Sequence, residues 1–120
     1  MNDNSVVVDK LWGTERWLVN EPGLYCVKEM TLVPGYKCSL HYHRLKDETF
    51  YINKGQMVLF VDNLNGQSGV IRLEEGDHYR IQPGVAHRFM AGRNETCWFI
   101  ECSTYHDDED VVRLEPSKAI

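Results

Sequence analysis

The sequence has little positive charge and no long hydrophobic run. It carries 13 Lys and Arg against 18 Asp and Glu, which gives a formal net charge of −5 over 120 residues. This balance argues against a nucleic-acid backbone or an anionic membrane as the main partner. No apolar run approaches the roughly 20 residues that a membrane-spanning helix needs. The segment from Met1 to Asp9 also lacks the basic and apolar regions of a secretory signal.

The sequence also lacks the CxxC pair of common zinc sites. A chain of 120 residues can bury a sizeable core without disulfide bonds. We therefore expect one domain over residues 1–120, with a short N-terminal extension and a C-terminal tail. We also expect a cytoplasmic protein with four reduced, mostly buried thiols: Cys26, Cys38, Cys97 and Cys102.

Turn residues recur roughly every 8–12 residues, and the runs between them are rich in β-branched and aromatic residues. This pattern predicts an all-β sandwich or barrel. The expected strands are Leu24–Val33, Thr49–Ile52, Met57–Val61, Val70–Leu73 and Cys97–Ile100. One turn is expected at 62–66. The best helical candidate is 10–19, although Gly13 lies inside it. The tail after Tyr105 is expected to form a turn and a short element that packs back on the barrel.

Histidine forms the most informative pattern. His41 and His43 are two residues apart, so on a strand their side chains project from the same face. Glu48 can open the next strand, and His87 follows a turn later in the chain. Three imidazoles and one carboxylate suit a divalent Zn, Fe, Mn, Ni or Co ion and do not suit Ca. The alternative is a half-exposed strand face with solvated histidines.

The spacing around these residues resembles the first motif of the cupin family at every position. A glycine is followed by five residues, an HxH pair, four residues, a glutamate, six residues and a second glycine. These positions are Gly35, His41, His43, Glu48 and Gly55.

The second cupin motif is matched less completely. Gly76 is followed by five residues, a Gln-Pro-Gly run, two residues and His87. Gln82 stands where the motif has proline, and Ala91 stands where it has asparagine. Neither departure falls on a ligand position. The resemblance implies a jelly-roll barrel, the double-stranded β-helix of cupins, in single-domain form. It also implies a homodimer and an interior metal site on His41, His43, Glu48 and His87.

Segments outside the two motifs resemble two groups of sugar isomerases. The stretch 10–15, with Trp12-Gly13, resembles the opening of the cupin domain of type II mannose-6-phosphate isomerases, and 110–115 resembles its ending. That family usually has Gln at the position of His41. The run 41–48 also resembles the HxHxxKxE pattern of cupin D-lyxose isomerases. Both resemblances imply aldose–ketose interconversion, but they differ on whether the sugar is phosphorylated.

Three charged residues are candidates for the chemistry of such a site. Lys46 lies at the entry to the Glu48 strand, where a buried lysine near a cation would have a lowered pKa suited to proton transfer. Glu101 stands in an otherwise apolar strand, so it is expected to be paired or functional. We assign Lys46 and Glu101 as catalytic residues and Lys28 as substrate-binding. The alternatives are an exposed loop lysine for Lys46, a salt bridge at a strand end for Glu101 and an outward-facing surface residue for Lys28.

Other residues are assigned simpler roles. His78 and His106 are expected on the surface. Trp12, Trp17 and Trp98 are expected to anchor the core or a dimer interface. The function favoured by the sequence is a metal-dependent isomerase of a sugar or sugar phosphate. A non-haem iron dioxygenase and a non-catalytic sugar-binding module remain alternatives.

Overall fold

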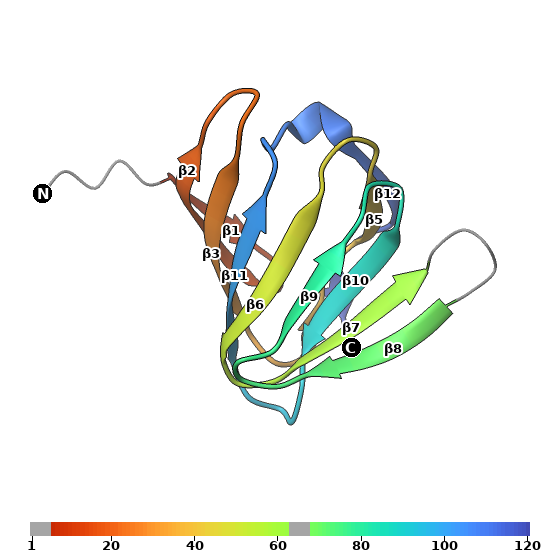
Figure 1. Ribbon diagram of the computed structural model, residues 1–120. Helices are drawn as coiled ribbons and strands as arrows, with labels where there is room; N and C mark the ends of the chain where they lie inside the picture. The colour runs from red at the N-terminus through yellow and green to blue at the C-terminus, as the bar shows by residue number, and fades with distance from the viewer. Residues whose placement is uncertain (1–5, 63–67) are drawn as a thin grey trace, which may run out of the picture.

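The computed structural model describes residues 6–62 and 68–120. Two antiparallel sheets lie face to face (Figure 1). The first has six strands in the order β1-β2-β3-β11-β6-β9. Its strands are β1 (Val6–Lys10), β2 (Gly13–Asn20), β3 (Cys26–Leu32), β6 (Glu48–Lys54), β9 (His78–Ile81) and β11 (Cys97–Ser103).

The second sheet has seven strands and contributes the opposite wall. It runs in the order β12-β5-β10-β4-β13, and β7 pairs with both β10 and β8. Its strands are β4 (Tyr36–Lys37), β5 (Leu40–His43), β7 (Met57–Asp62), β8 (Ser68–Leu73), β10 (Ala86–Ala91), β12 (Val111–Glu115) and β13 (Lys118–Ala119). A short 3-10 helix, η1 (Asp108–Asp110), precedes β12.

The all-β prediction is confirmed, and all five expected strands are present with small changes at their ends. The tail also behaves as expected, since β12 pairs with β5. The turn expected at 62–66 lies, apart from Asp62, outside the described residues. Within the described ranges, no helix has the length and hydropathy that crossing a membrane would require.

The helix expected over 10–19 is wrong, because this segment forms the end of β1 and most of β2. Gly13 explains the difference. Its φ is +148°, and a Cβ at this position would lie 1.8 Å from the carbonyl oxygen of Thr31. The backbone at Gly13 therefore passes close to β3, and β2 pairs with β1 on one side and β3 on the other.

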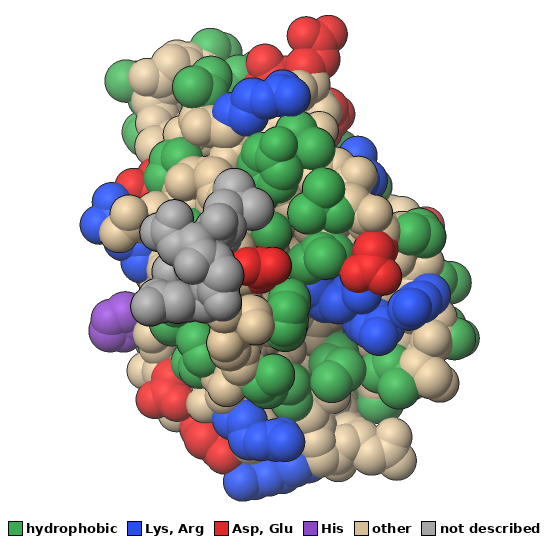
Figure 2. All heavy atoms as spheres, turned by 90° about the vertical axis from the view of Figure 1, so that its right-hand side faces the viewer, with side chains coloured by type: hydrophobic (Ala, Val, Ile, Leu, Met, Phe, Trp, Pro, Cys, Tyr) green, Lys and Arg blue, Asp and Glu red, His purple; other side chains and the backbone are tan. Residues whose placement is uncertain are grey.

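Aromatic side chains fill the space between the sheets. The rings of Phe50, Phe89 and Phe99 lie 5.1–5.7 Å apart, and Trp12 meets Phe89 edge-on at 5.1 Å. The core adjoins the histidines, since the ring of Phe50 also contacts that of His87. The side of the molecule shown in Figure 2 carries hydrophobic side chains mixed with charged ones.

The three tryptophans differ in their environment. Trp12 is buried in the core as predicted. Trp98 is 40% exposed, so it is not a core residue. Trp17 lines the cavity described below rather than the core. All four cysteines are unpaired, and Cys102 is the exposed one.

Candidate metal centre

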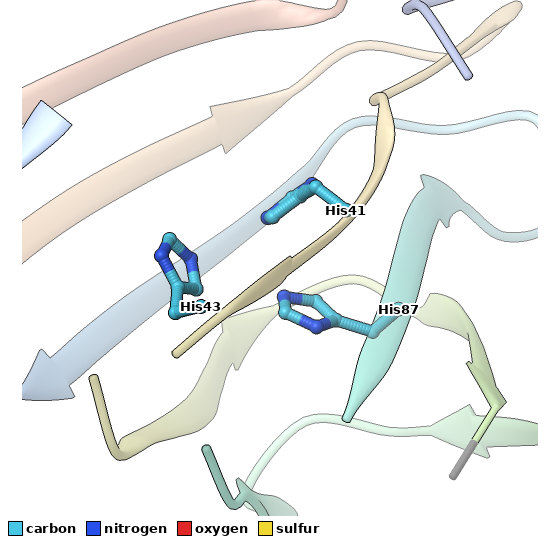
Figure 3. Close-up of side chains that lie close together, drawn as sticks. All are labelled: His41, His43 and His87. Atoms are coloured by element: carbon cyan, nitrogen blue, oxygen red, sulfur yellow. The ribbon is translucent and has the colours of Figure 1, made fainter. Parts of the chain in front are cut away.

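Two neighbouring strands bring three histidines together inside the barrel. His41 and His43 project from the same side of β5, and His87 projects from β10, where its Cα pairs with that of His41 (Figure 3). One ring nitrogen from each histidine lies within 4.8 Å of the others. The predicted convergence of His87 with the HxH pair is therefore confirmed. We call these residues the three-histidine cluster.

Hydrogen bonds to the main chain fix the orientation of each ring. The Nδ1 atoms of His41, His43 and His87 lie 2.9, 3.2 and 3.0 Å from the carbonyl oxygens of Ser39, Asp110 and Val85. A carbonyl oxygen only accepts, so each Nδ1 donates its proton and Nε2 is the nitrogen left to bind an ion. Metal-binding histidines are held in this way by a second hydrogen bond.

Glu48 supplies a carboxylate beside the cluster. It opens β6 and is 2% exposed. One of its oxygens lies 2.9 Å from Nε2 of His87, and the other lies 3.7 Å from Nε2 of His43. Despite these distances, both carboxylate oxygens and Nε2 of His87 are buried without an aligned hydrogen-bond partner. Unsatisfied lone pairs that face one another are unusual in a protein interior and suit a bound cation.

The protonation states of the cluster also suit a metal ion. Burial and the neighbouring His87 and His43 lower the pKa of His41 to about 3. Burial and the nearby Lys46 lower the pKa of His43 to about 4. Both rings are therefore neutral at pH 7. Burial also acts to lower the pKa of His87, but Glu48 outweighs it and raises this pKa above its ordinary value. A proton and a cation would compete for Nε2 of His87.

A cavity of about 230 Å³ opens from the cluster toward the solvent. Lys28, Lys46 and Glu101 all line it. With Glu15 and Glu48, they form what we call the buried charge network. Lys28 lies 3.3 Å from Glu15 and 4.0 Å from Glu101, and Lys46 lies 2.5 Å from Glu101 and 3.4 Å from Glu48.

All three candidate residues are therefore buried and face inward. Lys28 is 2% exposed, Lys46 3% and Glu101 5%. The alternatives of an exposed loop lysine and an outward-facing lysine do not apply. The expected lowering of the Lys46 pKa presupposes a bound cation, and without one the pKa moves the other way. Burial acts to lower it, but the carboxylates of Glu101 and Glu48 outweigh burial and raise the pKa of Lys46 above its usual value. Lys46 is therefore a fixed positive charge in this structure.

The sequence did not reveal three further residues of the cavity wall. His106 was expected on the surface, but it is 9% exposed and lies in the loop between β11 and η1. Its irregular backbone has no periodicity from which burial could be predicted. Glu15 and Trp17 lie on β2, where the expected helix concealed their shared strand face. Trp17 donates from its indole nitrogen to Glu15 at 3.0 Å, and its ring lies 4.5 Å from the ammonium of Lys28.

Comparison with a known protein sequence adds a distant relative. The chain is 30% identical over 114 residues to a D-lyxose/D-mannose isomerase of Thermosediminibacter oceani. The match covers 77% of this chain and 62% of the relative, so this chain spans less than two thirds of that protein.

Solved structures share the fold at low sequence identity. Oxalate decarboxylase from Bacillus subtilis has a TM-score of 0.83 at 20% identity, over 92% of this chain and 30% of its own. The capsular polysaccharide assembling protein CapF from Staphylococcus aureus has a TM-score of 0.81 at 18% identity, over 92% of this chain and 34% of its own. The sequence model of the cupin domain matches residues 28–101, which include the three-histidine cluster and Glu48. The chain therefore belongs to the cupin domain family.

Proposed function

We propose that this protein is a divalent-metal-dependent aldose–ketose isomerase that acts on a sugar or a sugar phosphate. One observation carries the proposal. Three ring-oriented imidazoles, and a carboxylate whose oxygens have no hydrogen-bond partner, share a cavity with a buried lysine–glutamate pair. The first group can hold a Lewis acid, and the second can supply a charged donor and a base. The distant similarity to a D-lyxose/D-mannose isomerase supports the same chemistry.

His41, His43, Glu48 and His87 would hold the ion. Their donor atoms, three imidazole nitrogens and one carboxylate, match Zn, Fe, Mn, Ni or Co. The residues fit such an ion because the lone pairs of Glu48 and His87 have no hydrogen-bond partner in the buried site. When bound, the ion would supply Lewis-acid polarisation of the sugar carbonyl.

The proton transfer is assigned to Glu101. Interconversion removes a proton from C2 of the aldose and returns one to C1, while the hydroxyl proton passes from O2 to O1. The Glu101 carboxylate can accept and return the carbon-bound proton, because it lies in the cavity wall. Lys46 stays charged beside it and can stabilise negative charge on the sugar oxygens by hydrogen bonding.

Lys28 is assigned to substrate binding. It lies between Glu15 and Glu101, and the two carboxylates already neutralise its charge. This environment favours a contact with a sugar hydroxyl over one with a phosphate. A homodimer, which the family implies, belongs to the same proposal and is tested by light scattering of the purified protein.

The experiment is turnover by metal-loaded protein of a panel of aldoses and their phosphates. Conversion to the ketose, followed by NMR, supports the proposal, and Glu101→Gln should abolish it while site metal is retained. Oxygen consumption with Fe(II) alone would instead identify a dioxygenase. Thermal stabilisation by a sugar without turnover would identify a binding module. Either result contradicts the isomerase assignment.

A further inference from the structure

His106 is held firmly in the cavity wall although it lies in a loop. Its backbone N–H donates to the side-chain oxygen of Asn20 at 2.9 Å, and its carbonyl accepts from the Asn20 amide nitrogen at 3.0 Å. Its ring meets Trp17 edge-on, with the ring centres 5.0 Å apart. The centre of the His43 ring lies 6.4 Å away. Main-chain and ring contacts therefore leave this side chain little freedom.

The neighbours of His106 select one tautomer. Nε2 lies 2.7 Å from a carboxylate oxygen of Asp108, and Nδ1 lies 3.1 Å from Nζ of Lys46. A carboxylate accepts and an ammonium donates, so Nε2 carries the proton and Nδ1 accepts from Lys46. His41 has the opposite arrangement, because its Nδ1 faces the carbonyl of Ser39. Two kinds of histidine therefore line the same cavity.

The contact fixes the direction of the Lys46 ammonium. This group has three N–H donors. One donates to Glu101 at 2.5 Å and a second to His106. The remaining N–H is on the side of Glu48, whose nearer oxygen lies 3.4 Å away and has no hydrogen-bond partner. Without His106, the ammonium could turn about its bond to Glu101.

We propose that His106 is a positioning residue of this site. Asp108 sets its tautomer, and its Nδ1 aims the free N–H of Lys46 at the region between Glu48 and the three-histidine cluster. The inference rests on the proposed function for the role of Lys46 during isomerisation. It goes further by assigning to the site a histidine that carries its proton on Nε2, whereas the metal-site rings carry theirs on Nδ1.

Two substitutions separate this role from simple packing. His106→Leu fills the space but removes the acceptor, whereas His106→Asn keeps an oxygen near the position of Nδ1. We expect His106→Leu to lower kcat roughly 10- to 100-fold with KM within about 2-fold, because a misplaced donor acts on the chemical step. His106→Asn should recover most of that loss. His78→Leu, which changes an exposed histidine on β9, is the matched control and should leave kcat unchanged.

NMR of the 15N-labelled, metal-free protein gives a readout that does not need turnover. We expect the proton on Nε2 of His106 and on Nδ1 of His41. We also expect a protected ammonium signal for Lys46 that is retained in His106→Asn and lost to fast exchange in His106→Leu. A proton on Nδ1 of His106, or an unchanged Lys46 signal in His106→Leu, would overturn the inference.

The two proposals fail in different ways. If no sugar is converted, the isomerase assignment fails and the NMR pattern alone decides the role of His106. If sugars are converted and His106→Leu matches the unsubstituted enzyme, the positioning role fails and the isomerase assignment stands.

Discussion

Replacing Lys46 with methionine measures the energy of the buried charge network. Methionine is similar in length and carries no charge. The Lys46 side chain is 2% exposed and lies 2.5 Å from Glu101 and 3.4 Å from Glu48. Removing one partner of a buried ion pair typically costs about 3–5 kcal/mol, because the other charge stays buried without compensation. We expect a loss of this size in the free energy of unfolding at pH 8.

This loss corresponds to a large change in melting temperature. The entropy of unfolding is about 2.1 cal/mol/K per residue, or about 0.25 kcal/mol/K for 120 residues. A loss of about 3–5 kcal/mol therefore lowers Tm by roughly 12–20 °C. Calorimetry of the metal-free protein measures this shift directly.

A neighbouring surface pair provides the control. Arg80 lies 2.6 Å from Asp47, but its side chain is 61% exposed. Arg80→Met should lower the free energy of unfolding far less than Lys46→Met, because water screens the exposed pair. Adding Glu101→Gln to Lys46→Met removes one of the two carboxylates that lose Lys46, so the double variant should recover part of the loss. A Lys46→Met protein as stable as Arg80→Met would refute the reasoning.

Three further predictions concern the metal and the backbone. His41→Ala and His87→Ala should each fold, as judged by circular dichroism, and each should lose most of the site metal in elemental analysis; full stoichiometry in both would remove the metal site. Metal affinity measured by calorimetry should fall from pH 7.5 to 5.5, because Glu48 raises the pKa of His87 and a proton then competes with the ion for Nε2 of that ring. His41, with a pKa of about 3, remains neutral over this range. An affinity independent of pH would contradict this. Gly55→Ala should destabilise by more than about 1 kcal/mol in denaturant titration, because φ is +86° and a Cβ would lie 2.5 Å from the Thr96 carbonyl oxygen. A neutral effect would show that the turn can move.

Spacing along the chain was sufficient to predict the three-histidine cluster. His41 and His43 share a strand face by the period of two, and the family motif places His87 opposite them. The strands were also predictable, because the Pro-Gly and Gly turns that bound them are recognised from neighbouring residues alone. The glycine of the first motif at position 55 also has a local physical basis, in its φ of +86°.

The rest of the cavity could not be predicted from local patterns. Glu15 and Trp17 appeared to lie on a helix, and only the pairing of β2 with β1 and β3 fixes their face. His106 is buried by contacts with Asn20 and Lys46, which lie 86 and 60 residues away along the chain. The charge state of Lys46 likewise depends on Glu101, a partner contributed by a distant strand.

The most direct test of the metal centre is an anomalous difference map from crystals soaked in Mn, Zn, Ni or Co and measured at the absorption edge of that metal. We predict one strong peak inside the barrel, at about 2.0–2.2 Å from a ring nitrogen of each residue of the three-histidine cluster and from a carboxylate oxygen of Glu48. Absence of any peak at these four residues, with ions bound only on the surface, would contradict the account.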